Sequence, residues 1–143
     1  MPLSLEDRDR ERFAAAPVAR LATVRPDGSP HVVPIVFALV DEVVWTGVDA
    51  KPKSTVALQR LTNIAAEPRV SLLVDEYDED WSRLWWVRAD GRARVVSDRR
   101  DVEEAITALV SKYSQYQEVS LSGPFVRVGV ESWRSWASRG RPE

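Results

Sequence analysis

A short basic segment holds the residues of this chain that are best suited to bind an anion. It precedes a stretch of helical character over residues 56–66 and contains Lys51, Lys53, Ser54 and Thr55. The first turn of a helix has unpaired backbone N–H groups and a partial positive charge, and both favour a bound anion. Ammonium and hydroxyl groups add the charge and the donors that a phosphate requires. The segment therefore predicts a phosphate site, and the alternative is a solvated basic turn followed by an ordinary N-cap serine.

Residues 84–96 offer a second surface for a ligand, because they alternate in character with the period of two that is typical of a strand. The apolar face carries Trp85, Val87, Ala89, Gly91, Ala93 and Val95, and the other face carries Trp86, Arg88, Asp90, Arg92 and Arg94. This separation favours one long strand, with Gly91 at a bulge or a point of close approach, over a hairpin that turns there. Trp86 beside Arg88 fits a planar anionic ligand, and a plain surface stripe of a barrel fits the pattern equally well.

The composition excludes several kinds of chemistry. The chain has 143 residues, no cysteine and one histidine, which rules out disulfides, thiolate ligands, cysteine nucleophiles and sites built on several histidines. We therefore predict no metal site and identify no catalytic residue. The net charge of −2 gives no support to nucleic-acid binding, and no apolar run approaches the roughly 20 residues of a membrane span. We expect a cytoplasmic protein.

Two polar features have both an ordinary and a functional interpretation. His31 follows a turn, so it is either a proton donor or, more commonly for a lone histidine, a surface residue. Residues 75–81 carry a run of carboxylates, which could suggest a divalent cation site. The run lacks the glycine and the alternation of a calcium loop, so a solvated loop or a partner for basic groups is favoured.

The remaining pattern predicts a β-rich domain. A turn over residues 25–28 joins strands over residues 18–24 and 30–40 into a hairpin. Pro34 lies inside the second strand and cannot donate a ladder bond, which indicates an edge, a bulge or a contact other than a strand. Further strands are expected over residues 43–48, 70–74, 84–96 and 125–130, and helices over residues 3–16, 56–66 and 98–113.

These strands mostly follow one another without helical crossovers, which favours a mainly β (α+β) fold. We expect an antiparallel barrel of about six strands with two or three flanking helices. One domain would span residues 1–143, with a helix in residues 1–16, the barrel in 17–137 and a frayed tail in 138–143. Trp133 and Trp136, expected to be exposed near the C-terminus, suggest an interface.

Several segments resemble the pyridoxamine 5′-phosphate oxidase-like split β-barrels. The first hairpin, LATV at residues 21–24 and PHVVPIVF at 30–37, is similar to theirs, as is TNI at 62–64 followed by EPRVSLLV at 67–74. The acidic, tryptophan-rich segment DEYDEDW at 75–81, with LWWVRADG at 84–91, resembles one branch of this class, which is assigned to the deazaflavin coenzyme F420. The resemblance covers the chain from about Phe13 to Trp136.

The resemblance implies a homodimer with two cofactor sites at the subunit interface. The backbone of Val33, Pro34 and Ile35 would face the cofactor ring, with Thr46 on the neighbouring strand. Lys53 matches the lysine of the phosphate loop, with Lys51 and Ser54 beside it. In the family this lysine precedes the asparagine by only a few residues, whereas Lys53 and Asn63 are ten apart, so Arg60 is expected to take up part of the phosphate's charge.

The resemblance implies an F420-dependent oxidoreductase that transfers a hydride between the reduced cofactor and a small organic substrate. A chain without a nucleophile triad or a metal set suits a cofactor that carries its own chemistry. One alternative keeps the fold and uses FMN. Another is a carrier or sensor that binds a cofactor or haem without turnover, although axial ligands for haem are scarce. The phosphodiester and oligoglutamate tail of F420 would favour the basic residues Lys51, Lys53, Arg60 and Arg88.

Overall fold

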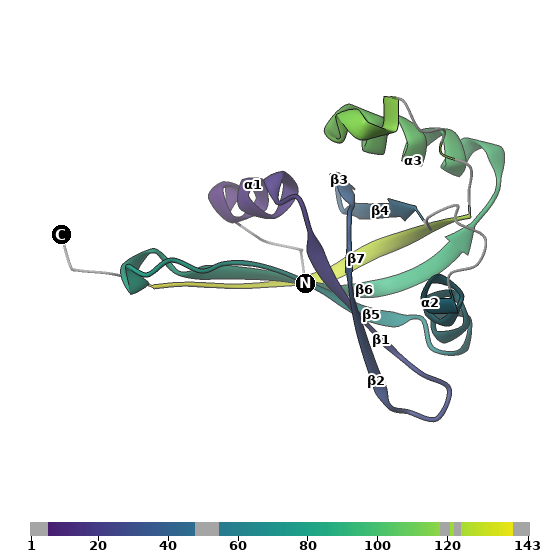
Figure 1. The fold of residues 1–143 in the computed structure, drawn as a ribbon, viewed down its shortest axis with the longest axis horizontal. Coiled ribbons are helices and arrows are strands. Elements are labelled where there is room, and N and C mark those ends of the chain that lie inside the picture. Colours follow the sequence, from purple (N-terminus) through teal and green to yellow (C-terminus); the bar gives the residue numbers. More distant parts are fainter. Residues whose placement is uncertain (1–5, 48–54, 118–120, 122–123, 139–143) are drawn as a thin grey trace.

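The computed structural model describes residues 6–47, 55–117, 121 and 124–138, and Figure 1 shows their arrangement. Within these residues the chain forms seven strands and three α-helices. The strands are β1 (Ala19–Val24), β2 (Pro30–Ile35), β3 (Ala38–Val40), β4 (Val43–Gly47), β5 (Arg69–Glu76), β6 (Trp85–Val96) and β7 (Phe125–Ala137). The helices are α1 (Asp7–Ala15), α2 (Thr55–Ala66) and α3 (Arg99–Lys112), with 3₁₀ turns η1 (Trp81–Arg83) and η2 (Ser114–Gln117).

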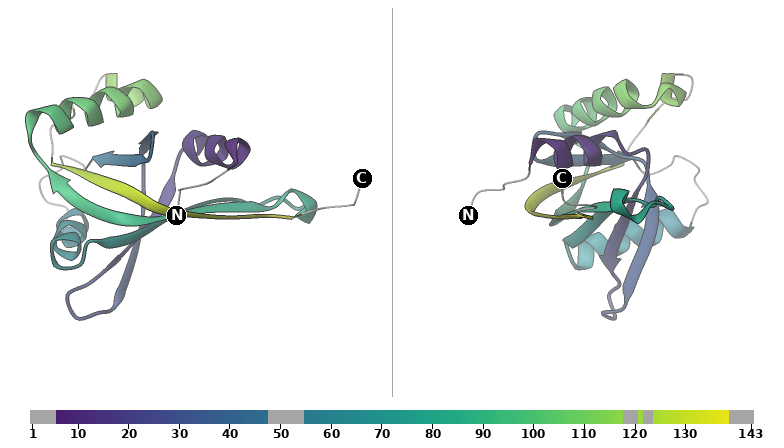
Figure 2. Two further views of the ribbon diagram at one scale, coloured as in Figure 1. Left: turned by 180° about the vertical axis from the view of Figure 1, so that it is seen from behind. Right: turned by 90° about the vertical axis from the view of Figure 1, so that its left-hand side faces the viewer.

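All seven strands pair antiparallel in one sheet, in the order β2-β1-β5-β6-β7-β4-β3. The two outer strands, β2 and β3, are consecutive in the chain and only Val36 and Phe37 separate them. The sheet therefore curls so that its two edges meet through a covalent link, as in a split barrel (Figures 1 and 2). The predicted fold class is confirmed, with seven strands in place of about six, because the expected strand over residues 30–40 is divided in two.

The division at residues 36 and 37 has a clear cause. The Thr46 hydroxyl donates a hydrogen bond of 2.8 Å to the carbonyl of Val36. The Tyr113 hydroxyl accepts from the N–H of Phe37 at 3.1 Å and lies 2.9 Å from the carbonyl oxygen of Pro17. Side chains here take the place of ladder hydrogen bonds, so the backbone leaves one edge of the sheet and enters the other without unpaired polar groups.

The long strand predicted through Gly91 is confirmed as β6. Its register with β7 shifts at this point: Asp90 pairs with Ser132 and Gly91 with Val130, so Glu131 is the extra residue of a bulge. Val87, Ala89 and Ala93 are buried as the alternation predicts. The pattern fails at the end of the strand, where Val95 is 40% exposed and Val96 packs instead against the cluster under α3.

The strand predicted over residues 125–130 was too short, because β7 continues to Ala137 and pairs with β6 along its whole length. As a result Trp133 is not exposed, contrary to expectation. It points into the core, is 5% exposed, donates from its indole nitrogen to Glu42 at 2.7 Å and meets Phe13 edge-on at 5.1 Å. Trp136 is 47% exposed, as predicted.

Two apolar clusters stabilise the barrel. The larger one fills the interior of the curled sheet and includes Phe13 of α1 and Phe37 of the β2–β3 link, whose rings lie 5.1 Å apart. The smaller one lies between α3 and the strands β3 and β4, with Trp45 and Leu109 fully buried. The helix predicted over residues 98–113 is confirmed as α3, and the carboxylate of Asp98 caps it by accepting from the N–H groups of Arg100 and Asp101.

Candidate functional site

A groove of about 470 Å³ crosses the outer face of strands β2, β1, β5 and β6. Its lining residues alternate along these strands with the residues that fill the barrel core. Val32, which is 60% exposed, and Leu73, which is 37% exposed, form its apolar part. The groove is lined by Arg20, Ala22, Val32, Ser71, Leu73, Asp75, Trp86 and Arg88. An apolar surface with charged groups around it suits a flat ligand that carries polar substituents.

The structure brings Trp86 and Arg88 together in this groove, as the alternation of β6 predicts. The guanidinium carbon of Arg88 lies 5.9 Å from the centroid of the Trp86 ring. Asp90 holds it there, because the Nε atom of Arg88 lies 3.0 Å from Asp90 Oδ1, which in turn accepts a 2.6 Å hydrogen bond from Ser71. The indole plane and the guanidinium therefore form a fixed wall of the groove.

The predicted ring-facing segment lies on the free edge of the sheet, since β2 pairs only with β1. Pro34 is therefore tolerated, because it lacks the N–H that an inner strand would need. The side chains of Val33 and Ile35 turn toward the core, and Ile35 is only 5% exposed. A ligand at this edge would meet the backbone of Val33, Pro34 and Ile35 rather than the side chains of Val33 and Ile35.

The other predicted ligands are divided between the interior and the part of the chain that is not described. Thr46 is 1% exposed and its hydroxyl proton is used in the bond to Val36, so its side chain has a structural role in the barrel. Lys51, Lys53 and Ser54 lie outside the described residues.

Arg60 on α2 is a buried cation, and the described residues provide no counterion for it. The residue is 8% exposed, and its Nε atom is buried with no hydrogen-bond partner. Burial lowers the pKa of the Arg60 guanidinium from its ordinary value, but an arginine remains protonated in proteins. Among the described residues no carboxylate lies within ion-pair distance of Arg60. A buried charge of this kind is costly unless an anion binds to it.

Comparison with known proteins identifies the family of this chain. The family model of pyridoxamine 5′-phosphate oxidase matches residues 5–137. The chain belongs to the pyridoxamine 5′-phosphate oxidase family. A search of curated proteins found no match.

Solved structures related to this family member share its fold. One is a conserved hypothetical protein from Mycobacterium tuberculosis, 24% identical, with 99% of this chain and 91% of that chain covered and a TM-score of 0.74. An FAD-binding protein from Mesorhizobium loti is 23% identical, with 92% and 94% covered and a TM-score of 0.66. The haem storage protein HutZ from Vibrio cholerae is 20% identical, with 94% and 95% covered and a TM-score of 0.70. At these identities the likeness establishes the fold.

A buried polar cluster under α2 was not recognised from the sequence of this family member. The side-chain amide of Asn63, which is fully buried, donates to the hydroxyl of Thr23 at 2.9 Å and accepts from Gln59 at 2.7 Å. His31 is directly across the strand pair from Thr23, and its Nδ1 atom is buried with no hydrogen-bond partner among the residues that the structure describes. His31 is thus half-buried on the inner face rather than a surface residue, and its role as a proton donor stays a prediction.

Lys112, in the last turn of α3, was also missed. Its ammonium lies 3.7 Å from the centroid of the Phe37 ring and has no hydrogen-bond partner within the described segments. Burial lowers the pKa of Lys112 from 10.5 to about 8. The spacing of apolar residues in α3 predicts its apolar face. The sequence does not show whether the amine of a lysine at the edge of that face is buried or in solvent.

Replacing Lys112 with methionine is expected to stabilise the fold at pH 7 by about 1 kcal/mol, after allowance for its partial exposure. The lysine has a folded pKa of about 8 against an ordinary 10.5, so between these pH values the unfolded chain binds more protons and stability rises with pH. The raised pKa of Tyr113 acts in the opposite direction above pH 10. Urea unfolding from pH 7 to 10 checks this expectation. The free energy of unfolding should rise with pH in the wild type and not in the variant. A wild-type free energy of unfolding that does not change over this range would contradict the expectation.

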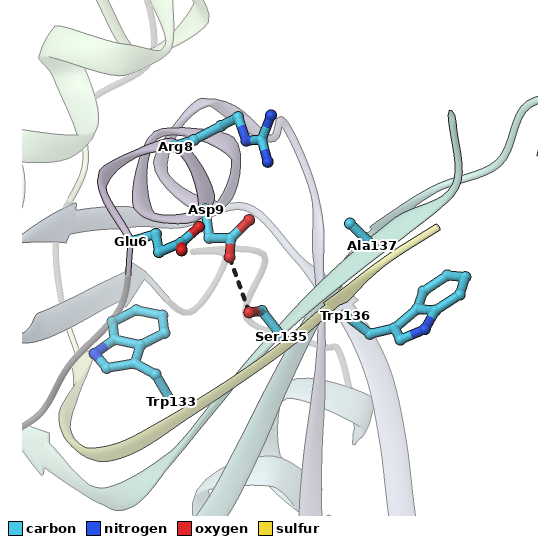
Figure 3. A pocket seen from close by; sticks show the side chains of 7 residues that line it. All are labelled: Glu6, Arg8, Asp9, Trp133, Ser135, Trp136 and Ala137. Carbon is cyan, nitrogen blue, oxygen red and sulfur yellow. Dashed lines mark hydrogen bonds between the residues drawn. The ribbon is translucent and has the colours of Figure 1, made fainter. Parts of the chain in front are cut away.

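A second cavity, of about 530 Å³, lies between α1 and β7 (Figure 3). Asp9, which is 9% exposed, accepts a 2.8 Å hydrogen bond from the hydroxyl of Ser135 and so fixes the helix to the strand. Trp136 points away from Asp9 on the other side of the strand (Figure 3). The polar groups of this cavity that face each other are already paired. We therefore interpret the cavity as part of the packing contact between α1 and β7.

Two classes of site are absent from the described part of the chain. No group of three or more histidine or acidic side chains there is arranged to hold a metal ion. Of the helices in the described segments, none combines the length and the apolar character that crossing a bilayer requires.

Proposed function

We propose that this chain is an F420-dependent oxidoreductase, which binds the deazaflavin in the groove over β2, β1, β5 and β6. The observation that carries the proposal is Arg60, a guanidinium buried on α2 with no counterion in the described part of the chain. The groove is on the outer face of the sheet, whereas α2 contacts the inner face, where Asn63 bonds to Thr23. The cofactor would therefore pass around the free edge at β2 to bring an anionic group to Arg60 as its counterion. Arg60 follows Lys51, Lys53 and Ser54 by six to nine residues in the sequence, and we propose that the four residues bind one phosphate.

The groove fits the ring system of such a cofactor. Val32 and Leu73 offer exposed apolar surface and Trp86 offers a π face, while Arg88 beside Trp86 is the cation that we assign to the acidic tail. The unpaired backbone edge at Val33, Pro34 and Ile35 borders the same strands and would provide hydrogen bonds to the polar edge of the ring.

The cofactor, when bound, supplies the hydride chemistry. The chain's own part is to hold the ring against the substrate and to exclude water from it. No described side chain is required as a nucleophile. The substrate class proposed is a small organic molecule that accepts or donates a hydride.

The groove would be completed by a second copy of the chain, in a homodimer with cofactor sites at the interface. Three aromatic side chains support this assembly because they are well exposed: Tyr77 at 69%, Trp81 at 67% and Trp136 at 47%. They lie on the arm formed by β5, η1, β6 and the end of β7, which extends beyond the body of the barrel (Figure 1). Exposed aromatic surface of this kind is typical of protein interfaces.

FMN is the second candidate cofactor. The family model and the FAD-binding protein from Mesorhizobium loti both support a flavin on this fold. The two cofactors differ in their tails, since FMN ends in one phosphate whereas F420 continues into an oligoglutamate. Arg88 lies at the groove rather than on α2, so it provides a separate cation for the longer, more acidic ligand.

A binding titration tests the cofactor. We expect the quenching of tryptophan fluorescence to report micromolar or tighter binding of F420 to the full chain, with FMN at least tenfold weaker. Replacing Arg88 with glutamine should weaken F420 by about tenfold, because a hydrogen bond to a charged group contributes about 1.5–3 kcal/mol, and should change FMN binding less. The matched control is Arg99→Gln, which removes the same charge from an exposed position on α3.

Each outcome of the titration is informative. A preference for FMN would retain the groove and move the protein to the flavin-dependent members of the family. Binding of neither cofactor would refute the proposal and favour a carrier or sensor of another ligand.

A further inference from the structure

We propose a second anion site, separate from the cofactor groove, formed by Arg92, Arg94 and Arg127 on the outer face of β6 and β7. Its ligand would be a small dianion of the phosphate type. These three arginines line a cavity of about 460 Å³ next to the bulge of β7. The site goes beyond the proposed function, which uses none of them.

The strand register places like charges against each other. Arg94 on β6 is the direct cross-strand partner of Arg127 on β7. Arg92 is two residues before Arg94, on the same face of β6, and is opposite Gly129. Like charges directly opposite each other destabilise a strand pair. An anion held between them would convert this repulsion into charge-assisted hydrogen bonds.

The local shape leaves space for such an anion. A Cβ atom on Gly129 would lie 3.4 Å from the Nη1 atom of Arg127, so the guanidinium of Arg127 lies over the glycine that is opposite Arg92. The absence of a side chain at Gly129 therefore leaves the space between the Arg127 guanidinium and the position opposite Arg92 open. Guanidinium groups with their planar sets of donors match the oxygen atoms of phosphate in geometry as well as charge.

The charges around the cavity do not balance. Arg92 is paired with Glu131 at 3.3 Å and Arg94 with Asp101 at 3.7 Å, and these guanidinium side chains are 57% and 61% exposed. The Arg92–Glu131 pair is exposed on both sides and therefore weak. Asp101 is only 17% exposed, but at 3.7 Å its contact with Arg94 is longer than a hydrogen bond, so donors of both guanidinium groups remain free. Within the described residues Arg127 has no carboxylate partner, and its guanidinium carbon lies 6.0 Å from the ring of Trp45. One uncompensated charge and two loosely held ones remain for a ligand.

The site is distinct from both parts of the proposed cofactor site. Arg92 follows Arg88 by four residues on the same face of β6, a separation of about 13 Å along a strand. Arg60 is on α2, which contacts the inner face of the sheet through Asn63 and Ile64, whereas the three arginines are on the outer face. A phosphate bound to Arg127 therefore need not compete with the cofactor's phosphate.

Calorimetric titration of the full chain with inorganic phosphate, at pH 7.5 and constant ionic strength, tests this site. We expect saturable binding that Arg127→Gln weakens about tenfold, as for the loss of a charged hydrogen bond. The control Arg99→Gln should bind like the wild type. Arg60→Gln removes the proposed site of the cofactor's phosphate, so the binding that this variant retains reports the Arg127 site alone, and the double variant Arg60→Gln/Arg127→Gln should lose it. Sulfate should compete with phosphate, whereas acetate at the same concentration should not.

A second readout follows from the repulsion between Arg94 and Arg127. In phosphate-free buffer, the melting temperature of Arg127→Gln should equal or exceed that of the wild type, whereas phosphate should raise the melting temperature of Arg60→Gln but not that of the double variant Arg60→Gln/Arg127→Gln. If Arg127→Gln does not fold, Arg92→Gln takes its place in both experiments. The proposal is overturned if phosphate does not saturate the wild type, if Arg127→Gln binds it equally well, or if Arg60→Gln alone abolishes the binding.

Discussion

Alanine in place of Gly91 is expected to lower the free energy of unfolding by about 3 kcal/mol, the upper part of the range for forcing a methyl group into a filled space. A Cβ atom at Gly91 would lie 2.2 Å from the carbonyl oxygen of Gly129 and 3.0 Å from the Cα atom of Val130. All of these atoms belong to the backbone of β7, so no flexible side chain can move aside. The β6–β7 pairing, the longest in the sheet, would have to separate locally.

Urea unfolding followed by far-ultraviolet circular dichroism measures the effect. Gly129→Ala is the matched control, because its new Cβ atom would meet only the end of the Arg127 side chain, at 3.4 Å, and this can move. We expect the control to change stability by less than about 1 kcal/mol. Equal losses in the two variants would show that the bulge tolerates a methyl group at Gly91 and that glycine is needed there for another reason.

The same strand shows how far the sequence leads. Alternation over residues 84–96 predicts one strand with a special position at Gly91, and both are confirmed. The extra residue of the bulge is Glu131, on the partner strand. A pattern within one strand describes that strand's faces, but the register depends on a pairing with residues some 40 positions away, which local periodicity does not record.

Interactions between distant segments also explain the errors in the fold. The strand over residues 30–40 divides because Thr46 and Tyr113 bond to the backbone of residues 36 and 37. Trp133 is buried because its ring packs edge-on against Phe13 and its indole N–H donates to Glu42. In each case local propensity gives the type of element correctly, and tertiary contacts determine where the element ends or which way a side chain points.

The candidate site was predictable to a different degree at each residue. Trp86 and Arg88 share a face because a strand has a period of two, so their meeting in the groove follows from the sequence. That Arg60 has no carboxylate partner among the described residues does not follow from the sequence. It depends on which acidic residues the fold brings close to α2. The opposition of Arg94 and Arg127 likewise requires the register of β6 and β7.

The Arg60→Met variant is expected to have two effects of opposite sign. In the absence of ligand, the loss of a buried, unpaired charge should raise the free energy of unfolding by about 1–2 kcal/mol, since methionine can replace much of the apolar stem. Binding of F420 should weaken about 30-fold, which corresponds to about 2 kcal/mol. Urea unfolding of the apo-protein and the fluorescence titration measure the two effects.

The Arg99→Met variant is the control for a change in net charge alone. Arg99 is on α3 and its side chain is 91% exposed, so its loss should leave both stability and cofactor affinity nearly unchanged. Arg60→Lys is a second test, because lysine retains the charge without the planar set of donors. It should bind F420 with an affinity between those of the wild type and Arg60→Met.

The opposition of the two signs separates a binding role from a structural one. A cation that stabilises the fold through contacts of its own would make Arg60→Met less stable, and any loss of cofactor affinity would then follow from local unfolding. A cation retained for a ligand costs stability until the ligand arrives, so its removal stabilises the free protein and weakens the complex. A variant that is both less stable and unchanged in affinity would show that Arg60 is structural, and the phosphate would then have to be bound by the segment that includes Lys51 and Lys53.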